Sequence, residues 1–85
     1  MPEKILAINI DKLRRASGWS VEELAKAVGV SRSTVNRWLA GTSMPQPENI
    51  SSLAAAFSER QGQEITISDL QDEPFDTAKL RSKPP

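Results

Sequence analysis

Residues 21–40 read VEELAKAVGVSRSTVNRWLA, and this stretch decides the fold. Ser20 lies just before it and is a good helix N-cap, and Glu23 completes a capping box three residues later. Gly29 can adopt the left-handed conformation that ends a helix, and Ser31 offers a second N-cap almost at once. Two short helices joined by so tight a turn are typical of a helix-turn-helix, with residues 32–40 as its second helix.

The segments on either side of this stretch carry the apolar spacing of helices. Leu6, Ile10 and Leu13 form one stripe, which predicts a helix over residues 4–17 that ends before Gly18. Pro47 suits the first position of a later helix that ends near residue 61, before Gly62. The apolar stripe of this later helix consists of Ile50, Leu53, Ala54 and Phe57.

The segment over residues 65–70, ITISDL, allows two interpretations. Strict alternation of apolar and polar residues would indicate a strand. Thr66 can instead act as an N-cap with Asp69 at the capping-box position, which predicts a short helix over about residues 67–72. We favour the helix, because a lone strand would have no partner here.

These elements together predict an all-α fold, a compact domain of four to five helices over residues 1–72. From Glu73 onward the composition changes to Pro, Lys, Asp and Ser, so we expect residues 73–85 to form a flexible tail or linker. Phe75 is the residue of this segment that we expect to fold back onto the core.

Composition excludes several classes of function. The chain has neither Cys nor His, which rules out disulfides, cysteine-rich zinc sites and catalysis by either residue. We find no phosphate-binding glycine loop and no nucleophile–base pair, so we expect neither an enzyme nor a cofactor. No stretch is apolar for the roughly 18 residues that a membrane span needs, and we expect a soluble, cytoplasmic protein.

The charges are unevenly distributed although the net charge is zero. Residues 1–45 contain seven Lys and Arg against four acids, whereas residues 46–85 contain four against seven. A basic front half and an acidic back half suit a protein that faces phosphates with one side. Ordinary solvated charge would give the same numbers.

About fifty residues resemble the phage repressor and Cro (XRE) family of helix-turn-helix domains. The matching residues are Leu13-Arg14, Gly18, Ser20 to Ala25, Gly29-Val30-Ser31, Thr34-Val35, Trp38, Gly41, Pro45 and Leu53-Ala54. The resemblance implies a lambda-repressor-like bundle that binds double-stranded DNA and acts as a transcriptional regulator, usually a repressor. It also implies a homodimer, because one module of this size buries too little surface for tight specific binding.

In this family the second helix of the motif points its first turns at base edges in the major groove. Carried onto this chain, the base-contacting candidates are Arg32, Ser33, Asn36 and Arg37. They share one helix face opposite Val35 and Trp38, and their side chains can pair with guanine or adenine. A merely solvated face of an amphipathic helix is the alternative interpretation.

Phosphate contacts are expected at the start of the first motif helix and in the loop after the second. The candidates are Ser20, Val21, Thr42 and Ser43, with charge supplied by Arg14 and Arg15. Many family members carry Gln where this chain has Val21, and a basic residue in the loop where residues 42–44 are neutral. Both departures suggest weaker binding per half-site.

A protein-interaction module, for example an antitoxin-like partner protein with the same fold, is the alternative function. The zero net charge and the acidic back half leave room for it. We interpret Trp19 and Trp38 as buried core residues and not as base-stacking aromatics, because they occupy staple and core positions.

Overall fold

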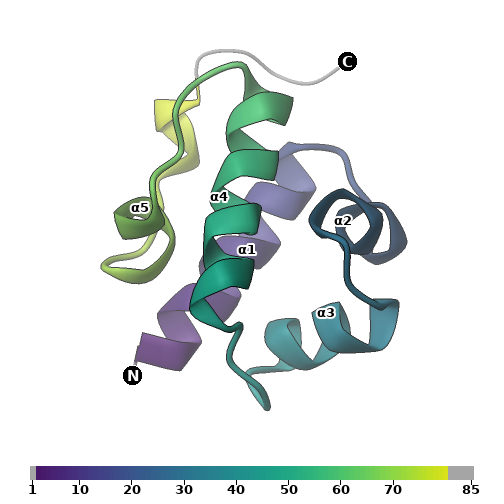
Figure 1. Ribbon diagram of the computed structural model, residues 1–85. Helices are drawn as coiled ribbons and strands as arrows, with labels where there is room; N and C mark the ends of the chain where they lie inside the picture. The colour runs from purple at the N-terminus through teal and green to yellow at the C-terminus, as the bar shows by residue number, and fades with distance from the viewer. Residues whose placement is uncertain (1, 81–85) are drawn as a thin grey trace.

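The computed structural model describes residues 2–80 as a bundle of helices (Figure 1). Within this range there is no strand, so the all-α prediction is confirmed. The elements are α1 (Pro2–Ala16), α2 (Val21–Val28), α3 (Arg32–Ala40), α4 (Pro47–Gln61), α5 (Ile67–Gln71) and a short 3-10 helix, η1 (Thr77–Lys79).

Local signals place the helix ends where the sequence predicted them. The Ser20 hydroxyl accepts a hydrogen bond from the Glu23 amide at 3.1 Å, and Glu23 accepts one from the Ser20 amide at 2.9 Å. Gly29 takes the left-handed conformation with φ of 84°, so α2 stops and the chain turns directly into α3.

The segment over residues 65–70 is helical, and the strand interpretation is wrong. The Thr66 hydroxyl accepts from the Asp69 amide at 3.0 Å, and Asp69 accepts from the Thr66 amide at 2.9 Å. This capping box starts α5 at Ile67, while Ile65 and Leu70 on either side of it are buried. The apolar residues alternate here because Ile65 before the N-cap and Leu70 within α5 both pack into the core.

The helices surround one apolar core. In Figure 1, α4 crosses in front of α1, with α2 and α3 on one side of this pair and α5 and η1 on the other. The contacts agree, because α3 packs on α1, α2 packs on α4, and α5 packs on both α1 and α4. Residues with almost no exposed surface in this core are Leu6, Ile10, Leu13, Leu24, Val35, Leu53, Phe57 and Leu70.

A buried asparagine ties the end of the chain to α1. Asn9 has no exposed surface, and its amide nitrogen donates to the carbonyls of Leu70 and Glu73 at 2.8 Å each. Phe75 is buried as well, so the packed chain continues past residue 72 as far as η1 and Leu80. The rest of the expected tail, residues 81–85, lies outside the described residues.

No helix among residues 2–80 combines the length and the apolar character that crossing a bilayer requires.

Candidate nucleic-acid interface

The candidate interface is the outward face of α3. Arg32, Ser33, Asn36 and Arg37 are all exposed there, whereas Val35 and Trp38 on the opposite face are 0% and 2% exposed. Within residues 2–80, none of the four outward side chains makes a hydrogen bond or an ion pair. Their donors and acceptors are therefore available to another molecule.

The backbone of α3 is fixed at both ends, so this face is presented on a rigid support. The Ser31 hydroxyl accepts from the Thr34 amide at 3.2 Å and lies 2.8 Å from the Thr34 hydroxyl. At the other end Gly41 is left-handed, with φ of 75°, and its amide donates to the carbonyls of Arg37 and Trp38.

The stretch of chain that contains α3 carries only positive charge. Residues 24–47 contain no Asp or Glu, and their charged residues are Lys26, Arg32 and Arg37. On the far side of the α1–α4 pair, residues 62–80 carry one Lys and five acids, which are Glu64, Asp69, Asp72, Glu73 and Asp76. Since α3 and α5 lie on opposite sides of the bundle (Figure 1), the two charge groups lie on opposite sides as well.

Arg14, expected to supply charge to phosphates, is mostly covered by the fold. Its side chain is 17% exposed, and its guanidinium donates to the Trp19 carbonyl at 2.9 Å and to Asp11 at 2.8 Å. It therefore braces the corner between α1 and α2. Arg15 is 73% exposed and contacts the same carboxylate at 3.0 Å, so Asp11 offsets part of the positive charge of both arginines.

At the start of α2, the capping box already uses some of the groups predicted to meet a phosphate. Ser20 is exposed, but its hydroxyl and its amide are both bonded to Glu23. These hydrogen bonds lower the pKa of the Glu23 carboxyl below 4.5, and the positive charges of Arg60 and Lys26 lower it further. Val21 is half-buried against the core, and its contribution could come only from its backbone amide.

The loop after α3 presents its predicted residues more openly. Thr42 and Ser43 are both exposed. The Thr42 amide and hydroxyl donate to the Arg37 carbonyl at 3.1 and 3.3 Å, which holds Thr42 at the end of α3. The structure thus brings Thr42 next to the α3 face, while Ser20 and Arg14 belong to the α1–α2 corner.

The sequence of these elements matches a known family. The model of the helix-turn-helix (HTH_3) family matches residues 10–60, which is more than half of the chain. The chain belongs to the helix-turn-helix family. Membership of this helix-turn-helix family agrees with the prediction that the protein is not an enzyme.

Solved structures share the fold of this helix-turn-helix protein. A hypothetical transcription factor, NHTF from Neisseria, is 28% identical with a TM-score of 0.76, over 87% of this chain and 78% of that one. The restriction-modification controller protein C.AhdI from Aeromonas hydrophila is 29% identical with a TM-score of 0.69, over 80% and 94%. The DNA-binding domain of the P22 c2 repressor is 20% identical, with a TM-score of 0.74 over 96% and 100%, and shows the fold alone. No curated protein matches the sequence.

The lambda-repressor-like fold expected from the sequence is thereby confirmed.

Sequence reasoning overlooked Arg60, whose guanidinium lies 5.9 Å from the centre of the Trp19 ring and donates to the Ser17 carbonyl at 2.9 Å. No local pattern could have indicated this contact, because it joins the end of α4 to the α1–α2 turn. Across residues 2–80, no cluster of acidic side chains is arranged to hold a metal ion.

Proposed function

We propose that this protein is a sequence-specific, double-stranded DNA-binding transcriptional regulator that places α3 in the major groove. The observation that carries the proposal is the outward face of α3, which is exposed, rigidly held, free of acids and unengaged by the rest of the described chain. An α-helix fits the major groove, where each base pair presents a distinct set of donors and acceptors.

The residue types on this face suit the reading of bases. Arg32 and Arg37 can each donate two hydrogen bonds to guanine O6 and N7, and the Asn36 amide can pair with adenine N6 and N7. Ser33 can donate or accept and is compatible with several bases. Since none of these side chains makes a hydrogen bond or ion pair within residues 2–80, DNA binding would not have to break one.

Phosphate contacts fix the orientation of such a helix without reading sequence. Thr42 and Ser43 are well placed for this role, because they are exposed at the end of α3. At the start of α2 we assign the contact to the backbone amides near Ser20 and Val21, and Arg15 is better placed than Arg14 to supply charge from α1.

We further propose that the protein binds as a homodimer through the end of the bundle where α5 meets the loop before α4. Met44 is 45% exposed and Ile67 is 41% exposed there, and exposed apolar side chains that gather in one patch can mark an interaction site. They line a hollow of about 380 Å³ together with Pro45, Pro47, Ile50, Ser51 and Gln71. Helix-turn-helix dimers bind half-sites about 34 Å apart, so a dimer formed through this patch has to hold its two α3 helices at that spacing.

Selection from random duplex DNA at moderate salt tests the proposal. We expect an enriched two-fold-related site that binds at least about a thousandfold more tightly than unrelated DNA. Binding should weaken steeply as salt rises, because each neutralised phosphate releases counterions. Selection that recovers no preferred duplex would overturn the proposal, and a partner whose binding survives high salt would favour the protein-interaction module.

Whether the protein represses or activates transcription depends on where its preferred site lies relative to a promoter. A dimer seated over a promoter excludes other proteins, so we propose repression. A reporter gene placed behind the selected site should lose expression when the protein is supplied, and the Asn36→Ala variant should restore it. Raised expression would identify an activator instead.

A further inference from the structure

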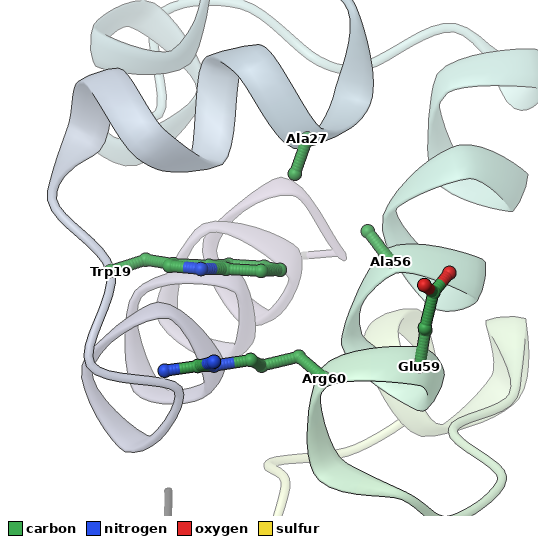
Figure 2. Close-up of a pocket in the computed structure, with 5 residues that line it drawn as sticks. All are labelled: Trp19, Ala27, Ala56, Glu59 and Arg60. Carbon is green, nitrogen blue, oxygen red and sulfur yellow. The ribbon is translucent and has the colours of Figure 1, made fainter. Parts of the chain in front are cut away.

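A second hollow lies between α2, with the Trp19 that precedes it, and the C-terminal half of α4. It measures about 410 Å³ and is lined by Trp19, Ala27, Ala56, Glu59 and Arg60. Figure 2 shows the indole of Trp19 edge-on, with the Arg60 guanidinium beneath one face and Ala27 above the other. The hollow lies beside this indole, with the small side chains of Ala27 and Ala56 in its wall, and Phe57 packs against the same indole with the two ring centres 5.9 Å apart.

The two charged residues of the hollow differ in how they are held. Arg60 is fixed, because its Nε donates to the Ser17 carbonyl and its guanidinium stacks on the indole. Within residues 2–80, Glu59 makes no hydrogen bond or ion pair. In Figure 2 its carboxylate extends upward beside Ala56, about level with the edge-on ring and away from the guanidinium.

This arrangement combines a flat aromatic surface with an unpaired negative charge. Aromatic rings gain energy by offset stacking, and small side chains on both helices leave space for a ring over the indole. A carboxylate at the mouth favours a positively charged group on whatever enters. Arg60 already uses its guanidinium to contact the indole and the Ser17 carbonyl, whereas Glu59 has no partner within residues 2–80.

We propose that this hollow binds a small aromatic molecule that carries a protonated amine, with the ring stacked on Trp19 and the amine bound to Glu59. The site is separate from the α3 face and does not depend on DNA binding. Such a ligand would contact both α2 and α4, which lie side by side only in the folded chain. Its binding would therefore stabilise the folded state.

Titration of the full-length protein with phenethylamine, followed by NMR, tests the proposal. We expect saturable shifts of the Trp19 indole N–H and of the Ala27 and Ala56 methyl groups, with a higher melting temperature. Phenethyl alcohol lacks the charge and should bind about fivefold more weakly, the range that an exposed ion pair supports. Phenylacetate should bind more weakly still.

Two variants assign the contacts. Glu59→Gln should remove the preference for phenethylamine over phenethyl alcohol while keeping the stacking shifts, and Ala27→Leu should fill the hollow and abolish binding of both. Glu64→Gln and Ala55→Leu change an exposed carboxylate and an exposed alanine elsewhere and should change neither. Equal affinity for phenethylamine and phenylacetate, an unchanged preference in Glu59→Gln, or no saturable shift would overturn the proposal.

Discussion

The backbone amide of Phe75 donates a hydrogen bond of 2.7 Å to the side-chain oxygen of Asn9, across 66 positions of sequence. The nitrogen of the same side chain donates to the carbonyls of Leu70 and Glu73 and, at 3.3 Å, to that of Asp69. The Asn9 side chain thus provides hydrogen-bond partners for backbone groups that have none within α5 or in the segment that follows it.

Replacing Asn9 with Ala should therefore destabilise the fold strongly. The change leaves buried backbone groups without partners and opens a gap under α5, so we expect the free energy of unfolding to fall by about 2–4 kcal/mol. Urea denaturation followed by circular dichroism measures it. Asn36→Ala, at an exposed asparagine of α3, is the matched control and should leave stability unchanged.

Replacing Arg32 with Ala should weaken DNA binding selectively. If its guanidinium reads a guanine, we expect a loss of about 1–3 kcal/mol on the preferred site and relaxed discrimination at one base pair. Fluorescence anisotropy with operator variants at fixed salt measures both effects. Arg15→Ala is the comparison, since Arg15 is proposed to face phosphates and a change at a phosphate contact weakens binding to all sequences alike. The same uniform loss for Arg32→Ala would reassign Arg32 to the DNA backbone.

The capping box of α2 should make stability depend on acid pH. The pKa of Glu23 is lowered from 4.5 in the folded state by its hydrogen bonds with Ser20, so its ionised form stabilises the fold above that value. This contribution is lost as the pH falls through the lower, folded-state pKa. In urea titrations, wild type should exceed Glu23→Gln in stability at neutral pH, and the difference should vanish in strong acid; a difference that grows on acidification would contradict this.

Replacing Ile67 with Asp should disrupt the proposed homodimer. Each subunit would then bring an unpaired carboxylate into an apolar contact. Burying these charges, and their mutual repulsion, would oppose association. Sedimentation at micromolar concentration should detect the dimer for wild type and the monomer for the variant. Ile8→Asp changes an isoleucine that is 49% exposed and lies outside the hollow, and it should stay dimeric.

The sequence predicted the helix ends well because caps act over three or four residues. Ser20 with Glu23 and Thr66 with Asp69 form the capping boxes expected of them. The four outward residues of α3 were predictable for a similar reason, since helical spacing places them opposite Val35 and Trp38.

Long-range contacts were not predictable from local patterns. The role of Asn9 depends on carbonyls more than sixty positions away, and in sequence it only interrupts an apolar run. Arg14 lies off the apolar stripe of its helix, yet the turn at Gly18 brings the Trp19 carbonyl into its reach. Arg60 likewise needs the folded bundle before it meets Trp19.

The separation of charge across the bundle gives this neutral protein an electric dipole that runs from the α5 side to α3. A neutral molecule feels little net pull from DNA, but a dipole in a non-uniform field feels a torque. Near a duplex the protein would rotate until α3 faces the phosphates, before any side chain makes contact. This alignment would act only within about 10 Å at 0.1 M salt, so added salt would slow productive encounters even though the net charge of the protein is zero.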